Sequence, residues 1–224
     1  MLIIKNLKKE VTLAEQQRLT ILLVPKLELL DHQQAVICGP SGSGKTTLLN
    51  VVAGLTLPTE GEVVYDEIKI TELSEEQRDL WRAQNIGYIF QKFNLLEQLT
   101  VLENIQLAAF LAKLPINEAI NNKIKSLIKE IGLAEKINMK PFALSIGEQQ
   151  RVGVARAIIT EPKLILADEP TASLDKENAK LIINLLRDFA KKSGAAMLVS
   201  SHDPMVIEQF DCCFPILRPQ GGIV

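Results

Sequence analysis

A single stretch, Gly39-Pro40-Ser41-Gly42-Ser43-Gly44-Lys45-Thr46, decides the fold of this chain. It fits the pattern G-x-x-x-x-G-K-[ST], in which glycines let successive backbone N–H groups turn inward around polyphosphate oxygens. Lys45 then supplies a positive charge for the β- and γ-phosphates, and the Thr46 hydroxyl can bind Mg²⁺. The pattern predicts a phosphate-binding loop, and a chance glycine-rich turn is the alternative.

The residues on either side of this loop favour the phosphate-binding interpretation. Residues 35–38 form a short apolar run, as expected of a buried parallel strand. Residues 46–53 predict a helix that Gly54 can end. The order strand, glycine loop, helix is the one that a phosphate site needs, because the helix N-terminus favours anions.

Short apolar runs elsewhere in the chain alternate with helical patterns. The strand predictions cover residues 2–8, 18–30, 62–70, 86–90, 163–167 and 195–200. The helix predictions cover residues 74–84, 99–114, 118–131, 148–160 and 176–193. This alternation indicates a parallel sheet, and such sheets bind ligands at the carboxyl ends of their strands. Gln91, Asp168, Glu169 and His202 each follow a predicted strand, so we expect them near the glycine loop.

Composition excludes several classes of function. The chain has 224 residues, 47% of them hydrophobic, and a net charge of −2, which gives no basic field for nucleic acid. No apolar run approaches the roughly 20 residues of a membrane span, and the first residues lack the shape of a signal peptide. Cys38, Cys212 and Cys213 indicate neither a metal site nor a disulfide framework, and we expect Cys38 to be a small buried residue of a strand in a cytoplasmic protein.

Six motifs in a fixed order carry a resemblance to a known family. The loop at 39–46 is followed by Gln91, by Leu144-Ser145-Ile146-Gly147-Glu148-Gln149-Gln150-Arg151, by an apolar strand ending in Asp168 and Glu169, by Ser173-Leu174-Asp175, and by His202. Over nearly its whole length the chain resembles the ATP-binding subunits of ABC transporters. Residues 88–91, 94–96 and 100–104 are similar to one branch of that family, which contains the lipoprotein-release, macrolide-exporter and cell-division ATPases.

The resemblance implies a fold and a set of partners. The expected fold is α/β, a P-loop NTPase core with a mostly parallel sheet, an N-terminal antiparallel β subdomain and an inserted α-helical subdomain. Residues 1–224 would form one ABC ATPase domain, with the helical subdomain at about 92–160. The expected partners are a second ATPase subunit with ATP at the interface and an integral membrane permease. The chain would lie in the cytoplasm, bound to the inner face of the membrane through that permease.

The resemblance also assigns roles to the motif residues. Asp168 would hold Mg²⁺, Glu169 would be the general base toward the attacking water, Gln91 would sense both, and His202 would contact the γ-phosphate. The expected contacts with ATP are Gly39, Pro40, Ser41, Gly42, Ser43, Gly44, Lys45, Thr46, Thr47, Ser145 and Gly147. The expected contacts with Mg²⁺ are Thr46, Gln91 and Asp168. Without the other motifs, His202 or the strand end at Asp168 would more simply be read as structural.

Ser145 and Gly147 would reach the γ-phosphate of ATP bound to the second subunit, which implies a head-to-tail dimer with two ATP molecules. Three residues depart from the family pattern. Ile146 stands where the family usually has glycine, Glu148 replaces the usual glutamine, and Val11 stands where an aromatic residue usually stacks on adenine. Isoleucine is stiffer and bulkier than glycine, and an aromatic stack is worth about 1–3 kcal/mol in nucleic-acid binding. Nucleotide affinity or turnover could therefore be reduced.

Three functions are compatible with these patterns. The first is an ATPase that powers a separate membrane transporter, and the second is a regulatory or mechanical ATPase that acts on a membrane complex without moving a solute. The third is a nucleotide-dependent dimerisation module with low turnover, which Val11 and Ile146 suggest. A groove near Gln91 would suit a partner helix and could be formed by Phe90, Phe93, Leu95 and Leu96, although core packing explains these residues at least equally well.

Overall fold

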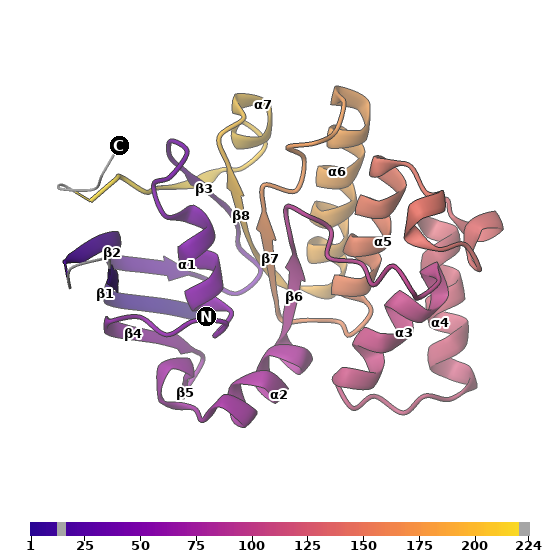
Figure 1. Ribbon diagram of the computed structural model, residues 1–224, viewed down its shortest axis with the longest axis horizontal. Coiled ribbons are helices and arrows are strands. Elements are labelled where there is room, and N and C mark those ends of the chain that lie inside the picture. The colour runs from indigo at the N-terminus through magenta and orange to yellow at the C-terminus, as the bar shows by residue number, and fades with distance from the viewer. Residues whose placement is uncertain (13–16, 220–224) are drawn as a thin grey trace.

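Two sheets with helices around them make up the computed structural model, which describes residues 1–12 and 17–219 (Figure 1). Within these residues, a parallel sheet has the strand order β6-β7-β8-β3-β9. Its strands are β3 (Gln34–Cys38), β6 (Ile86–Ile89), β7 (Leu164–Asp168), β8 (Ala196–Ser201) and β9 (Cys212–Pro215). An antiparallel sheet has the order β2-β1-β4-β5. Its strands are β1 (Leu2–Thr12), β2 (Arg18–Leu29), β4 (Glu60–Tyr65) and β5 (Ile68–Lys69). The predicted fold class is confirmed.

Helix ends follow from local sequence at most positions. Asn117 and Asp175 accept backbone hydrogen bonds from the first turns of the helices that they precede, and Gly194 ends a helix with φ 73. The helices are α1 (Lys45–Val52), α2 (Glu75–Asn85), α3 (Val101–Leu111), α4 (Glu118–Glu130), α5 (Ile146–Ile158), α6 (Lys176–Ser193) and α7 (Pro204–Ile207). Of the helices in residues 1–12 and 17–219, none is long and apolar enough to cross a membrane.

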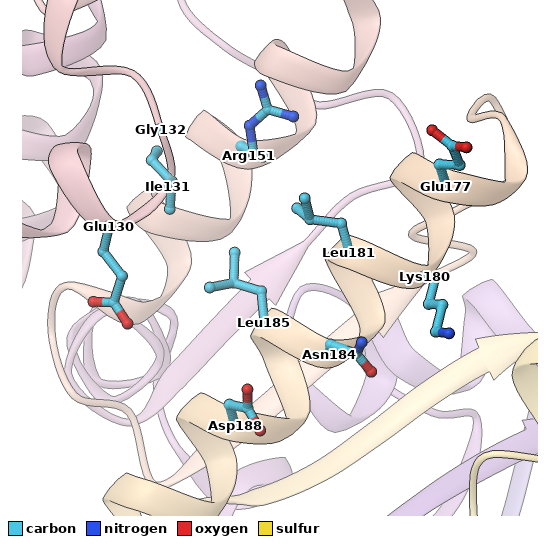
Figure 2. A pocket seen from close by; sticks show the side chains of 10 residues that line it. All are labelled: Glu130, Ile131, Gly132, Arg151, Glu177, Lys180, Leu181, Asn184, Leu185 and Asp188. Atoms are coloured by element: carbon cyan, nitrogen blue, oxygen red, sulfur yellow. The ribbon is translucent and has the colours of Figure 1, made fainter.

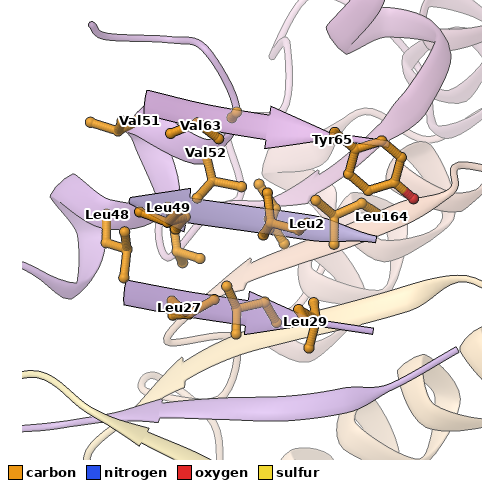
Figure 3. Close-up of a cluster of buried hydrophobic side chains, with 14 of the residues drawn as sticks. Leu2, Leu27, Leu29, Leu48, Leu49, Val51, Val52, Val63, Tyr65 and Leu164 are labelled. Carbon is orange, nitrogen blue, oxygen red and sulfur yellow. The ribbon is translucent and has the colours of Figure 1, made fainter. Parts of the chain in front are cut away.

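Alternation along the parallel strands puts α1 and α5 on opposite faces of the sheet. Successive residues of a strand point to opposite sides. Leu164 and Leu166 of β7 pack in one cluster with α1 and the antiparallel sheet, and Figure 3 shows α1 side chains meeting those of β1, β2 and β4 there. Ile165 and Ala167 pack in another cluster, with α5 and α6. The sheet therefore lies between α1 and α5.

Helices α3, α4 and α5 share a third hydrophobic cluster. Ile105 of α3, Ile124 and Ile128 of α4, and Val152 and Ala155 of α5 are buried together in it. Each full burial of such a side chain is worth about 1.5–3 kcal/mol relative to exposure. The three helices thus have a core of their own, within the stretch where the sequence predicts a helical subdomain, and the limits of that subdomain stay a prediction.

One strand prediction differs from the structure, and one strand of the structure was not predicted. Residues 62–70 form the hairpin of β4 and β5 instead of one strand, because the chain turns at Asp66, whose φ is 53. Asp tolerates this left-handed conformation better than most residues, but the sequence lacks the glycine that usually announces such a turn. Strand β9 was not predicted; it is four residues long and pairs with β3 at the edge of the parallel sheet.

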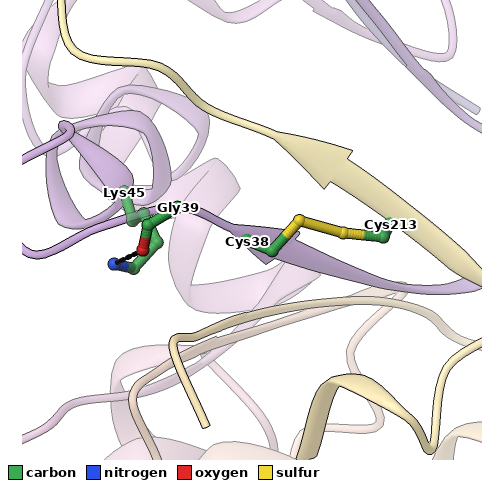
Figure 4. The surroundings of a disulfide bond; sticks show 4 residues. All are labelled: Cys38, Gly39, Lys45 and Cys213. Atoms are coloured by element: carbon green, nitrogen blue, oxygen red, sulfur yellow. Dashed lines mark hydrogen bonds between the residues drawn. A yellow bond between two sulfur atoms is a disulfide. The ribbon is translucent and has the colours of Figure 1, made fainter. Parts of the chain in front are cut away.

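Two parts of the cysteine prediction are wrong, the absence of a disulfide and the burial of Cys38. The structure joins Cys38 of β3 to Cys213 of β9 by a disulfide (Figure 4), and Cys38 is only half-buried. The parallel register pairs Val36 with Cys213, so the two cysteines lie on neighbouring strands with their Cα atoms 6.4 Å apart. They are separated by 175 residues along the chain, and their proximity depends on the unpredicted strand β9.

Candidate active site

The glycine loop connects β3 to α1 as the sequence predicts. Gly44 has φ 96, and an added Cβ would lie 2.7 Å from the Ile21 carbonyl oxygen, so glycine is required there. The Lys45 ammonium group donates a 2.8 Å hydrogen bond to the carbonyl oxygen of Gly39 (Figure 4) and a 3.2 Å one to that of Pro40. Lys45 is only 7% exposed, so its charge is held over the loop.

A hydroxyl inside this loop suits a phosphate ligand. Ser43 is fully buried, and its Oγ has no hydrogen-bond partner among the residues that the structure describes. Buried hydroxyls almost always have a hydrogen-bond partner, and a phosphate oxygen at the loop would accept a hydrogen bond from this hydroxyl. Thr46 and Thr47 follow in the first turn of α1, where Thr46 is exposed and Thr47 half-buried. The loop therefore fits a polyphosphate.

Two acidic residues stand at the carboxyl end of β7 and are fixed by the neighbouring strand. Ser200 of β8 donates a 2.6 Å hydrogen bond from Oγ to Asp168 Oδ1. The same Oγ accepts a 3.0 Å bond from the backbone N–H of Glu169. Glu169 has φ 44, a conformation that costs free energy in a non-glycine residue and recurs at functional sites. The motifs missed Ser200, although a polar residue near the carboxyl end of an apolar strand is a usable signal.

The Glu169 carboxylate contacts residues that follow two other strands. Its Oε1 lies 3.6 Å from Lys45 Nζ and 2.8 Å from His202 Nδ1. The Glu169 side chain is 12% exposed and that of His202 is 63% exposed, so solvent reaches this cluster from the His202 side. The structure thus brings Lys45, Asp168, Glu169 and His202 together, from the ends of β3, β7 and β8.

Three of the predicted site residues lie apart from this cluster. Gln91 is exposed after β6, and within the described chain no hydrogen bond or ion pair joins it to the other site residues. Ser145 and Gly147 lie at the start of α5, on the other face of the sheet. An added Cβ at Gly147 would lie 3.0 Å from Asn178 Oδ1, so close packing against α6 also favours glycine there. The roles of these three residues stay predictions.

The residues suited to Mg²⁺ are few and carry oxygen. The described residues contain no group of three or more His, Cys, Asp or Glu side chains that could enclose a metal ion. Mg²⁺ at nucleotide sites is held by one or two protein ligands together with phosphate oxygens and water. A hydroxyl and a carboxylate beside a phosphate-binding loop are ligands of this kind, so Thr46 and Asp168 fit the ion.

A separate hollow between α5 and α6 lies outside the predicted site. Figure 2 shows Arg151 on α5 facing a row of side chains on α6. The hollow has a volume of about 730 Å³, and its lining includes Glu130, Leu181 and Asp188. None of the predicted site residues lines it. Arg151 donates a 3.4 Å hydrogen bond to Asn178 Oδ1 and so connects the two helices near their first turns.

A glycine loop between a parallel strand and a helix, with a lysine and two acids gathered at adjoining strand ends, defines a P-loop nucleotide-binding protein. Within that class the comparison with known families is specific. Residues 24–172 match the family described as "ABC transporter". The chain belongs to this family and is one of its ATP-binding, ATP-hydrolysing subunits.

Named relatives support the narrower branch that the sequence indicates. The lipoprotein-releasing system ATP-binding protein LolD of Pseudomonas syringae pv. tomato is 39% identical, over 88% of this chain and 85% of that protein. LolD of Legionella pneumophila (strain Lens) is 36% identical, over 83% of this chain and 81% of that protein. The macrolide export ATP-binding/permease protein MacB of Campylobacter jejuni is 41% identical over 77% of this chain, which corresponds to 27% of MacB.

Solved structures have the same fold. The ATP-binding cassette MJ0796, as a dimer in a post-hydrolysis state bound to ADP and Pi, superposes with a TM-score of 0.90 at 34% identity. The superposition covers 97% of this chain and 94% of that one. A structure of cbiO1 from Clostridium perfringens, part of the transporter complex cbiONQ, has a TM-score of 0.81 at 25% identity. It covers 96% of this chain and 84% of that one.

Proposed function

We propose that two copies of this chain bind Mg-ATP between them and hydrolyse it to drive a separate integral membrane partner. The observation that carries the proposal is the contact of Glu169 with both Lys45 and His202 beside the glycine loop. A general base, a phosphate-binding cation and a second polar group are thereby concentrated at one loop. This is the set that phosphoanhydride hydrolysis needs.

The contact between Lys45 and Glu169 gives ATP binding a direct consequence. Without a phosphate, the Lys45 ammonium group is shared between loop carbonyls and the Glu169 carboxylate. The β- and γ-phosphates offer Lys45 stronger, charge-assisted hydrogen bonds. Lys45 then turns to the phosphates and Glu169 becomes available to accept the proton of the attacking water. His202 stays hydrogen-bonded to the carboxylate and orients it.

Mg²⁺ would be held by Thr46 and Asp168, with Gln91 approaching when the nucleotide is bound. When bound, the ion supplies positive charge that stabilises the phosphate oxygens during transfer. The hydrogen bond from Ser200 to Asp168 Oδ1 supports this assignment, since it orients the carboxylate before any metal arrives.

The second half of each site comes from the partner subunit. Ser145 caps α5 and Gly147 lies in its first turn, and α5 packs on the opposite face of the sheet from α1, the helix that follows the loop of the same chain. Helix α5 nevertheless begins with backbone N–H groups and a serine hydroxyl, which together suit an anion. Helices α3, α4 and α5, within about residues 92–160, carry residues 144–151, here called the signature segment, to the partner's γ-phosphate. The dimeric form of the cassette MJ0796 supports such an arrangement.

A groove beside Gln91 suits the membrane partner. It has a volume of about 740 Å³ and lies between α2, the end of β6 and α3. Its apolar wall includes Phe90, Leu96 and Leu111, and Asp79 and Arg156 add charges. Phe90 stacks on Tyr88 with ring centroids 4.2 Å apart, so it both packs against the core and lines the groove. We expect a short helix of the membrane partner to occupy this groove. The ATPase would then act at the cytoplasmic face of the membrane, where ATP is supplied.

A dimerisation module with low turnover is the second candidate. Ile146 favours it, because its side chain is 53% exposed directly beside Ser145, where the family usually has glycine. A bulky side chain at this position would slow closure on the partner's γ-phosphate. Steady-state ATP hydrolysis by the purified chain distinguishes the two, since the module would release almost no phosphate.

Glu169→Gln tests the proposed function. Glutamine keeps the shape of the side chain but cannot accept a proton, so we expect hydrolysis to fall by about 10²–10⁴-fold while ATP stays bound. Light scattering should detect a stable dimer that forms only with ATP and Mg²⁺. Unchanged turnover would assign the base elsewhere, and a monomer under all conditions would refute the dimeric site.

A further inference from the structure

The start of α5 already contains a negative charge. Glu148, in its first turn, accepts a 2.9 Å hydrogen bond at Oε2 from the backbone N–H of Ser145. Ser145 Oγ in turn accepts a 3.3 Å bond from the backbone N–H of Glu148. This reciprocal capping box holds the carboxylate at the N-terminus of the helix, where the field of the helix favours anions. A phosphate that approaches Ser145 meets that carboxylate.

Lys136 compensates this charge. It ends a short 3₁₀ helix, η3 (Ala134–Lys136), and its Nζ lies 2.7 Å from Glu148 Oε1. Each oxygen of the carboxylate therefore has a partner, Lys136 on one side and the Ser145 N–H on the other. The side chain of Glu148 is only 16% exposed, so solvent screens its charge poorly. Lys136 and then Ser145 lower the pKa of Glu148, which keeps the carboxylate ionised.

We propose that Lys136 is a positioning residue of the signature segment, which neutralises Glu148 so that α5 can accept the partner subunit's γ-phosphate. The proposal rests on the proposed function, because it takes Ser145 as a contact with the partner's ATP. Without Lys136 the carboxylate would stay in place, held by the Ser145 N–H and the helix field, and would repel the phosphate. With a neutral residue at 148 the lysine would no longer be needed.

A double-mutant cycle separates this charge effect from a structural one. The parent is Glu169→Gln, which accumulates the ATP-bound dimer, and the added changes are Lys136→Met, Glu148→Gln and both together. Glutamine preserves the capping box, because it can also accept from the Ser145 N–H. The readout is the dissociation constant of the dimer with ATP and Mg²⁺, measured by sedimentation at low and high salt.

The expected result is a rescue. Lys136→Met should weaken the dimer about tenfold at low salt and less at high salt, since ions screen the repulsion. Adding Glu148→Gln should restore the dimer to within about threefold of the parent. Lys123→Met is the matched control, because Lys123 of α4 forms a 2.7 Å pair with Glu161, which follows the other end of α5. It should leave the dimer unchanged.

Two results would overturn the inference alone. One is a Lys136→Met protein that dimerises like the parent. The other is a Lys136→Met defect that Glu148→Gln does not relieve, which would assign Lys136 a structural role in η3 and α5. If the Glu169→Gln parent itself stays monomeric with ATP, the proposed function fails and this inference fails with it.

Discussion

Ser200 is the residue on which both acids of the site depend. It bonds Asp168 through Oγ and holds the strained backbone of Glu169 through Oγ and its carbonyl oxygen. Ser200→Ala should lower the steady-state ATPase rate about tenfold and cost about 1–2 kcal/mol of stability, because Asp168 loses a buried partner. The matched control is Ser201→Ala. Ser201 is equally buried in the same strand, but its hydroxyl accepts a hydrogen bond from the backbone N–H of Asp203 instead. Equal rates in the two variants would contradict the positioning role of Ser200.

We expect Lys45 to provide much of the affinity for phosphate. Replacement by alanine removes the charge that the β- and γ-phosphates bind, and hydrogen bonds to charged groups are worth about 1.5–3 kcal/mol. Lys45→Ala should therefore weaken ATP binding at least about tenfold in a calorimetric titration. Lys191→Ala, at an exposed lysine in the last turn of α6, should bind ATP like the wild type. Wild-type affinity in Lys45→Ala would mean that the loop does not bind the nucleotide.

At the scale of elements, the first residue of α5, Ile146, decides how freely the turn beside Ser145 can move. Ile146 is the first residue of α5 and its side chain is exposed, so Ile146→Gly removes no core packing. We expect turnover to rise or stay level, because glycine restores freedom to the turn, with a loss of about 0.5 kcal/mol in stability from helix propensity. Ile146→Ala removes the bulk without adding that freedom and separates the two effects. A large drop in turnover of a folded Ile146→Gly protein would assign Ile146 a positive role.

Most helices could be predicted because the residues next to their ends determine where they begin and end. Asn117, Asp175 and Gly194 act as the cap residues that their types indicate. The start of α5 was misplaced by two residues, because the apolar Ile146 concealed a capping box between Ser145 and Glu148. The turn at Asp66 and the strand β9 were missed because the neighbouring sequence does not indicate them. Their structure depends on pairing with distant strands, β1 and β3.

The site was predictable to a similar extent and for similar reasons. Parallel strands bring their carboxyl ends together, so Lys45, Glu169 and His202 could be expected to meet before their distances were known. Ser200 could be noticed as a polar residue near the end of an apolar strand, but its contact with Asp168 and Glu169 could not be predicted, since it depends on which strand lies beside β7. The compensation of Glu148 by Lys136 likewise needed the three-dimensional position of η3.

At the scale of the whole molecule, the proposed function gives one chain two separate half-sites, both of which would meet the same second copy. The loop and acids lie at the carboxyl edge of the parallel sheet, whereas Ser145 begins a helix on the face opposite to α1. If Ser145 acts on a nucleotide, as proposed, a second copy is needed to complete a site. Mixing a Ser145→Arg subunit with a Lys45→Ala subunit would then create one intact site per mixed dimer, and some ATPase activity should return.

The most direct test of the dimeric site is the steady-state ATPase rate of Ser145→Arg by itself. The arginine would place a bulky cation against the partner's nucleotide and block closure, while the loop that binds ATP stays intact. We predict calorimetric ATP affinity equal to the wild type, with hydrolysis reduced to background. Ser193→Arg, at the exposed end of α6, controls for the added charge and should hydrolyse ATP normally. A Ser145→Arg protein that hydrolyses ATP at the wild-type rate would contradict the account.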